Sequence, residues 1–238
     1  MMDHLIEYAD KKAEYCIENT VISQRLYEEY GVNLGLRNEK GEGVLTGLTT
    51  ISKIVSSKIV NGEKVSCDGE LWYRGYMIED LISSLGEDYG FEKIAYLLLI
   101  GNMPSETELR EFCDVLADSR TLPNDFTRDV IMKASTEDIM SSMAKSILTL
   151  ASYDEKAKDT SIPNVLRQSI QLIAVFPLLA VYGYNTYRHY DKNDSMFIHR
   201  PDPKLLTAEN FLMMLRPDKK FSKTEAKVLT CQTINLKP

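Results

Sequence analysis

The 238-residue sequence lacks the short motifs that mark the commonest catalytic sites. It has no H-E-x-x-H and no G-x-S-x-G. No G-x-G-x-x-G follows a strand-like run, and no GK[ST] follows the glycine-rich stretch 35–47. These absences argue against a zincin-type metal site, a serine nucleophile elbow, a Rossmann nucleotide site and a P-loop.

Cysteine and histidine are scarce. The four cysteines, Cys16, Cys67, Cys113 and Cys231, are far apart and form no CxxC pair. We expect reduced, buried or half-buried thiols rather than disulfides or a metal site. The three histidines are His4, His189 and His199. His4 is expected at the surface, and the other two flank a polar loop with no Cys, Asp or Glu at a metal-ligand spacing. The sequence predicts no metal.

Positive charge and long apolar runs are also limited. Lys and Arg number 28 against 35 acidic residues, for a net charge of -7. This balance argues against binding to nucleic acid or to an anionic membrane. The most apolar run, 170–184, is shorter than the about 20 residues that span a bilayer, and Pro177 interrupts it. It predicts a buried, kinked helix. With no apolar signal region near the N-terminus, we expect a cytoplasmic protein.

The stretch 66–81, SCDGELWYRGYMIEDL, changes from a strand-like to a helical period across one glycine. Upstream, 51–66 contains Asn61-Gly62 between two β-prone runs, which is a strong hairpin signal. Leu71–Tyr73 is expected to add a third strand, with Trp72 as a core anchor.

Downstream, almost everything has helical periodicity. Ser105 followed by Glu108 predicts a capping box at a helix start. Helices are expected over 5–30, 77–85, 91–101, 106–119, 123–133, 138–153, 163–188 and 207–215, and from 222 or 223 onward. No internal domain boundary stands out. The fold class is therefore mainly α, with one small N-terminal β-element.

Several charged and aromatic residues could carry chemistry, but each has a simpler structural explanation. Glu79 and Asp80 fit the first turn of a helix, where carboxylates favour the dipole. Arg74 could bind an anion, and an ion pair with a helix carboxylate is the preferred interpretation. Tyr182, Tyr184, Tyr187 and Tyr190 fit core packing or a subunit interface better than base stacking, because basic residues do not alternate with them. Taken alone, the residues predict a soluble acidic helical domain without an assembled active site.

Ordered stretches of the chain nevertheless resemble the citrate synthase family. These are GVLTGLTTISKIV, DGELWYRGYMIEDL, FEKIAYLLLIGNMPSETEL, MSSMAKSILTLASYD, LRQSIQLIAVFPLLAVYGY, MFIHRPDP and TAENFLMMLRPDKKFSKTEA. Each stretch is modestly specific, but their shared order is highly specific. The resemblance extends over about 35–229 and is closest to the bacterial type.

The resemblance implies an all-α homodimer in which a large and a small domain close over acetyl-CoA and oxaloacetate. In that family one histidine stabilises the enolate, an aspartate removes the methyl proton, another histidine acts on the keto carbonyl, and arginines hold the carboxylates. No metal or other cofactor is implied.

The family's histidine motifs, HxEHGGG, GPxHG and GxGH, do not occur in this sequence, and the resemblance lapses over its last nine residues, TCQTINLKP. We therefore expect no catalytic residue here. The expected organisation is an N-terminal helical extension, 1–34, followed by part of the large domain, 35–238, truncated or frameshifted and inactive by itself.

One functional position of the family matches. Gly35-Leu36-Arg37 resembles a Gly-apolar-Arg element whose arginine reaches coenzyme A at the partner subunit's site. Arg37 is accordingly a candidate CoA contact, and a solvated loop arginine is the alternative. Two other readings of the whole chain stay open: a non-catalytic helical dimerisation or assembly module, and a fragment of a 2-methylcitrate synthase.

Overall fold

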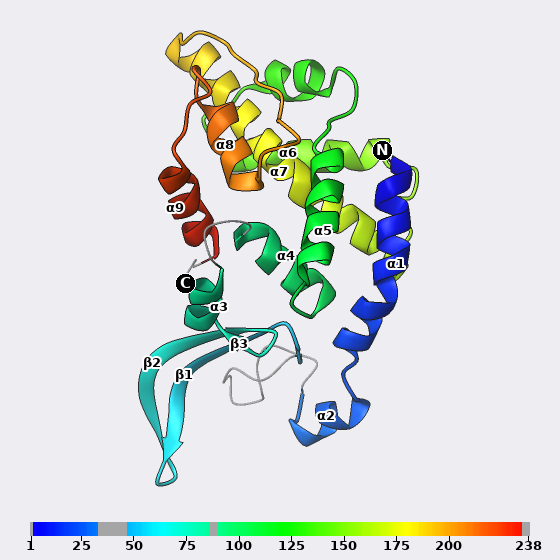
Figure 1. Ribbon diagram of the computed structural model, residues 1–238, viewed down its shortest axis with the longest axis vertical. Helices are drawn as coiled ribbons and strands as arrows, with labels where there is room; N and C mark the ends of the chain where they lie inside the picture. Colours follow the sequence, from blue (N-terminus) through cyan, green and yellow to red (C-terminus); the bar gives the residue numbers. More distant parts are fainter. Residues whose placement is uncertain (1, 33–46, 86–89, 235–238) are drawn as a thin grey trace, which may run out of the picture.

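The computed structural model describes residues 2–32, 47–85 and 90–234. Helices form most of the molecule, and a small antiparallel sheet projects from one end (Figure 1). The helices are α1 (Met2–Thr20), α2 (Gln24–Glu29), α3 (Ile78–Ser84), α4 (Gly90–Ile100), α5 (Glu106–Ser119), α6 (Ile139–Leu150), α7 (Ile162–Lys192), α8 (Thr207–Leu215) and α9 (Lys223–Ile234). The predicted mainly helical fold class is confirmed.

The sheet consists of β1 (Ser52–Val60), β2 (Glu63–Tyr73) and β3 (Tyr76–Met77), in that order. Asn61 and Gly62 have φ of 53° and 84°, so the predicted hairpin turn is confirmed. The position of the third strand was wrong. Leu71–Tyr73 ends β2, and β3 follows a second two-residue turn in which Arg74 and Gly75 also have positive φ.

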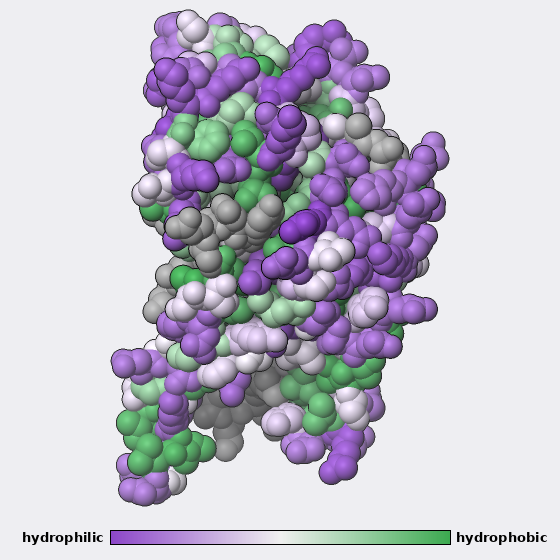
Figure 2. Space-filling view, viewed as in Figure 1, coloured by the Kyte–Doolittle hydropathy of each residue, from purple (hydrophilic) through white to green (hydrophobic). Residues whose placement is uncertain are grey.

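Trp72 is half-buried and lies outside the three core clusters, so its prediction as a core anchor was wrong. Because side chains alternate along a strand, its neighbours Leu71 and Tyr73 pack against the core instead. The far end of the hairpin is apolar and exposed, with Ile59, Val60 and Val65 all exposed to solvent. Figure 2 shows hydrophobic surface over the far end of β1 and β2.

The single helix expected over 5–30 is divided into α1 and α2. Thr20 Oγ1 donates to the Cys16 carbonyl at the end of α1, and Ser23 is extended at the start of α2. Thr20, Val21 and Ile22 are β-branched in succession, which lowers helix propensity at the break. α1 packs against α4, α5 and α7.

Most other helix boundaries are as predicted. The Ser105–Glu108 capping box at the start of α5 is confirmed. The helix expected over 123–133 is instead a short π-helix, Thr127–Ile131, followed by a short 3-10 helix, Met132–Ala134. A second 3-10 turn, Ala151–Tyr153, extends α6.

α7 is the central helix. It runs through Pro177 and contributes to two of the three clusters of buried apolar residues, one with α1, α4 and α5 and one with α6 and α8. The third cluster lies between α3 and α4. Among the described helices, α7 alone is long and apolar enough to cross a membrane by length and composition, and half of its most apolar window is buried. A core helix of this length passes the same test, so the burial supports the predicted core role.

Candidate functional site

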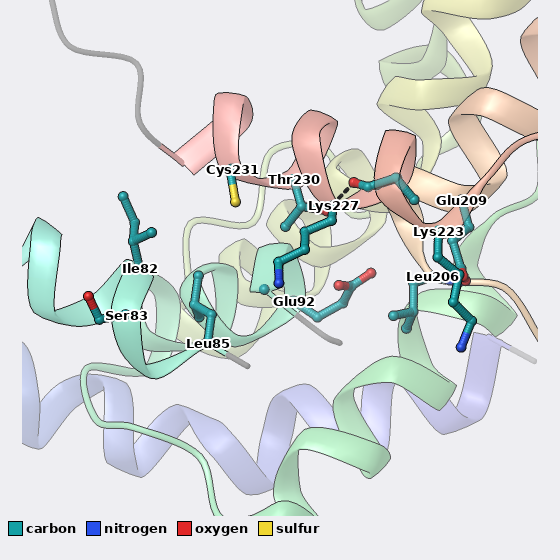
Figure 3. Close-up of a pocket in the computed structure, with 13 residues that line it drawn as sticks. Ile82, Ser83, Leu85, Glu92, Leu206, Glu209, Lys223, Lys227, Thr230 and Cys231 are labelled. Atoms are coloured by element: carbon teal, nitrogen blue, oxygen red, sulfur yellow. Dashed lines mark hydrogen bonds between the residues drawn. The ribbon is translucent and has the colours of Figure 1, made fainter. Parts of the chain in front are cut away.

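A cavity of about 350 Å³ lies between α3, α4, α8 and α9 (Figure 3). Apolar side chains form much of its wall, and charged side chains come from α4, α8 and α9. The lining residues are Ile82, Ser83, Leu85, Gly90, Glu92, Leu206, Ala208, Glu209, Lys223, Ala226, Lys227, Thr230 and Cys231. The cavity thus combines an apolar wall with a few convergent polar groups, as small-molecule sites do.

Glu92 is the most buried charged group of the cavity, with 2% of its surface exposed. Its Oε1 accepts a hydrogen bond from the Thr207 amide at 2.8 Å, at the first residue of α8. The same oxygen lies 4.0 Å from the guanidinium of Arg120. Arg120 also donates to the Leu205 carbonyl at 2.7 Å and to Thr207 Oγ1 at 3.1 Å. A carboxylate at a helix N-terminus and a nearby guanidinium therefore hold the start of α8 against α4 and α5.

Two lysines of α9 provide the positive charge. Lys223 and Lys227 are four residues apart and so share one helix face. Within the described part of the chain, neither ammonium lies within 4 Å of a carboxylate. Figure 3 shows the Lys227 side chain pointing into the cavity toward Glu92. The sequence analysis missed both lysines and Glu92, although Glu92 is a charged residue in an otherwise apolar helix.

The histidines occupy separate places, and none lines this cavity. His4 Nδ1 lies 2.9 Å from Asp118 Oδ2 on α5, and both side chains are partly exposed. His189 Nδ1 lies 2.8 Å from the Asp194 carbonyl oxygen, and His199 Nε2 lies 3.2 Å from that of Pro217. Within 2–32, 47–85 and 90–234, no three or more His, Cys, Asp or Glu residues cluster as metal ligands would. Arg37 lies outside the described residues.

Arg74 makes a different interaction from the one predicted. Its guanidinium donates to the carbonyls of Asn19 and Leu98 and to Thr50 Oγ1, each at 3.1 Å. No carboxylate of the described residues lies within 4 Å of it, so the expected ion pair was wrong. Asn19 and Leu98 stand at the C-terminal ends of α1 and α4, where the helix dipole favours a cation. Burial lowers the pKa of Arg74. Glu79 and Asp80 do lie in the first turn of α3, as predicted.

A second buried charge, that of Lys12, joins α1 to α4 and α5. Lys12 Nζ donates to Glu108 Oε1 at 2.7 Å and to the Tyr96 hydroxyl at 2.9 Å. It also lies 5.2 Å from the ring centre of Tyr15 and 5.3 Å from that of Tyr96. Burial acts to lower the pKa of Lys12, but the hydrogen bonds to Glu108 and Tyr96 raise it overall. The hydrogen bond from Lys12 is the main reason that the pKa of Glu108 falls to about 2.

The four tyrosines at the end of α7 do not form one stacking platform. Tyr182 is buried, and its hydroxyl donates to the His199 carbonyl at 2.9 Å. Tyr184 and Tyr190 are exposed, and Tyr187 is half-buried. The preferred expectation of core packing holds for Tyr182.

The comparisons with known proteins agree on one family. Residues 35–235 match the family model described as "Citrate synthase, C-terminal domain". The citrate synthase of Corynebacterium glutamicum is 29% identical over 175 residues, covering 71% of this chain and 38% of that protein. The citrate synthase of Haloferax volcanii is 32% identical over 180 residues, covering 73% and 42%. This chain therefore spans about two fifths of the length of these relatives.

Solved structures show the same fold. The citrate synthase of Pyrobaculum aerophilum superposes with a TM-score of 0.65 at 24% identity, covering 84% of this chain and 48% of that one. The citrate synthase of Thermoplasma acidophilum, in a complex with carboxymethyl coenzyme A and oxaloacetate, gives 0.63 at 24% identity, covering 84% and 47%. Because the family model matches most of the residues of this chain and the fold is that of solved citrate synthases, the chain belongs to the citrate synthase family.

Proposed function

We propose that the chain is the N-terminal part of a citrate synthase, the enzyme that condenses acetyl-CoA with oxaloacetate to give citrate and CoA. The match of 35–235 to the citrate synthase family model supports the family. The N-terminal placement is proposed from the order of the resembling stretches and from the family's histidine motifs, which do not occur in this sequence. Residues 35–238 would form part of the large domain, and 1–34 a helical extension whose α1 packs into the core. The condensation needs no metal or other cofactor. A cytoplasmic location goes with this proposal, and fractionation of expressing cells tests it.

We further propose that these 238 residues alone do not catalyse the condensation. The family's three histidine motifs do not occur in them, and the histidines that are present lie apart and bond to Asp118 or to backbone carbonyls. The test is citrate formation from acetyl-CoA and oxaloacetate by the purified chain, beside a full-length citrate synthase as control. We expect no citrate above the rate without enzyme. Turnover that rises with the concentration of the chain would refute this part of the proposal.

The surface of α6 supports the proposed homodimer. One face of α6 packs on the core through Met143, Ile147 and Leu150. The adjoining face exposes Met140 and Leu148, which are 75% and 76% exposed, with Ala144 between them. A helix whose apolar surface extends beyond the face that packs on the core normally has a second covering partner. We therefore expect a second copy to cover this face, and light scattering at micromolar concentration should give twice the monomer mass. A monomer would contradict the proposal.

A 2-methylcitrate synthase is the second candidate within the family. The 2-methylcitrate synthase 2 of Corynebacterium glutamicum is 24% identical over 173 residues. Co-expression with the remaining C-terminal part of a related citrate synthase, followed by assays with acetyl-CoA and with propionyl-CoA, addresses the choice. Higher kcat/KM for acetyl-CoA supports the first candidate, and higher kcat/KM for propionyl-CoA supports the second.

A further inference from the structure

β1 is a free edge of the small sheet. In the described part of the chain it pairs only with β2, which lies between β1 and β3. The strand contains no proline and no glycine, and its side chains Ile54, Ile59 and Val60 are 66%, 79% and 52% exposed. Figure 1 shows the hairpin projecting from the helical body, and no described helix covers its far half. An exposed apolar edge of this kind is a template for pairing with another strand.

The other side of the hairpin is less suited to pairing. From Val55 to Ser57, β1 advances two residues, whereas β2 advances four over the same stretch. The wider stretch of β2, which includes Gly69, interrupts the ladder, and irregularities of this kind protect an edge from pairing. β1 itself is extended without a break over Ser52–Val60. The sheet therefore offers one long regular edge, that of β1.

The sequence of β1 is complementary to itself in an antiparallel register centred on Ser57. The pair Ile-Val occurs twice, at 54–55 and at 59–60, with Ser-Ser-Lys between the two pairs. In this register each isoleucine lies opposite a valine of the second copy, and Lys58 lies opposite Ser56. Apolar side chains that meet directly across two strands stabilise the pairing. Centred on Ser56 instead, the same strands would place each lysine opposite an isoleucine.

The lysines of β1 do not oppose this pairing. Lysine on an edge strand normally discourages the approach of another strand, and β1 has two, Lys53 and Lys58. The ammonium group of Lys58 lies 2.7 Å from a carboxylate oxygen of Glu70 on β2 of the same hairpin. In the register centred on Ser57 no two lysines are directly opposite, so the repulsion between like charges is small.

We propose that β1 is an interaction surface for a second copy of this chain, through antiparallel pairing of 54–60 about a twofold axis at Ser57. The two hairpins then form one continuous sheet. This surface is separate from the exposed face of α6 and from the condensation chemistry. Interfaces that bury less than about 1,200 Å² are usually weak, and a single short strand lies at this end of the range. We therefore expect the pairing at millimolar rather than micromolar concentration.

Sedimentation equilibrium of the purified chain at micromolar and at millimolar concentration tests the proposal. We expect the average mass to rise to about twice its micromolar value or more. Ile59→Lys, which places a charge opposite a valine, should remove the rise. Val21→Lys, which replaces another strongly exposed apolar side chain outside the sheet, should keep it. No rise for the unmodified chain, or an equal rise for Ile59→Lys, would overturn the proposal. The ratio of the two masses does not depend on whether α6 forms a dimer, so each contact is tested separately.

A cysteine at the twofold axis tests the register. All variants carry Cys67→Ser, which removes the thiol beside Ser66, the β2 partner of Ser57. Ser57→Cys should then form a disulfide between two chains in glutathione disulfide, because directly paired residues have Cα atoms about 4.5–5.5 Å apart. Lys53→Cys is the control, since in this register it lies far from its counterpart in the second copy. Non-reducing electrophoresis measures the covalent dimer. Equal crosslinking of the two variants, or none for Ser57→Cys, would overturn the proposal.

Discussion

Replacing Lys12 with methionine tests whether a single buried charge holds α1 to the helical body. Lys12 is 2% exposed, and its ammonium group bonds both Glu108 and Tyr96. Methionine keeps most of the unbranched stem, so the change removes the charge and its hydrogen bonds with little loss of packing. It leaves Glu108 with its bonds from Ser105 and Tyr96.

The expected cost follows from these contacts. A hydrogen bond to a charged group contributes about 1.5–3 kcal/mol, and removing one partner of a buried ion pair costs about 3–5 kcal/mol. Glu108 keeps 31% of its side chain exposed, so water can compensate part of the loss. The lysine also leaves the faces of the tyrosine rings, which adds about 0.5–1 kcal/mol. We expect the free energy of unfolding to fall by about 3 kcal/mol.

The neighbouring lysine provides a matched control. Lys11 also pairs with a glutamate of α5, Glu111, at 2.7 Å, but its side chain is 59% exposed. Exposed ion pairs contribute about 0–1 kcal/mol, so Lys11→Met should be nearly neutral. In urea unfolding, Lys12→Met should lower the midpoint by about 1 M or more relative to Lys11→Met. Equal midpoints for the two variants would show that burial of the pair does not matter, and would refute the reasoning.

The pH dependence gives an independent check. The hydrogen bond from Lys12, followed by that from the Ser105 amide, lowers the pKa of Glu108 to about 2 from an ordinary value of 4.5. A lowered carboxyl pKa stabilises the folded state fully above pH about 4.5, and this stabilisation is lost as the pH falls toward about 2. The difference in stability between the unmodified chain and Lys12→Met should therefore shrink across that interval. A difference that stays constant down to pH about 2 would contradict the assignment.

Three further predictions concern two junctions between elements and the exposed face of α6. Gly101→Ala should lower the free energy of unfolding by about 2 kcal/mol or more, because Gly101 has φ of 101° and an added Cβ would clash with Asn19 Cβ. Gly69→Ala is the control, since a Cβ at Gly69 meets nothing within 4 Å. Equal urea midpoints for the two variants would count against the clash. Arg74→Lys should lower the free energy of unfolding by about 1–3 kcal/mol in the same assay, since an ammonium group cannot reproduce the planar guanidinium that bonds two helix ends. An unchanged urea midpoint would mean that these bonds are dispensable. Leu148→Glu should halve the mass measured by light scattering while leaving the circular dichroism unchanged, and a dimer that persists would exclude the exposed face of α6 as the interface.

The sequence by itself determined the local features. The Ser105–Glu108 capping box and the Asn61-Gly62 turn depend on residues within three positions of one another, so their signals are visible in a short window. The bounds of α5 and α8 were predicted for the same reason. The ordered stretches also identified the family, which the family model confirmed over 35–235. Arg37, the one site residue taken from that resemblance, stays a prediction.

Only the tertiary structure decided which distant groups meet. Arg74 bonds backbone carbonyls of α1 and α4. Every residue has a carbonyl, so the sequence does not show which carbonyl an arginine will bond, and the predicted ion pair was wrong. Glu92 reaches the Thr207 amide across 115 positions, and Lys12 reaches Glu108 across 96. The cavity exists because α9 packs across α4 and α8. Such contacts depend on how helices pack against one another, which local periodicity does not specify.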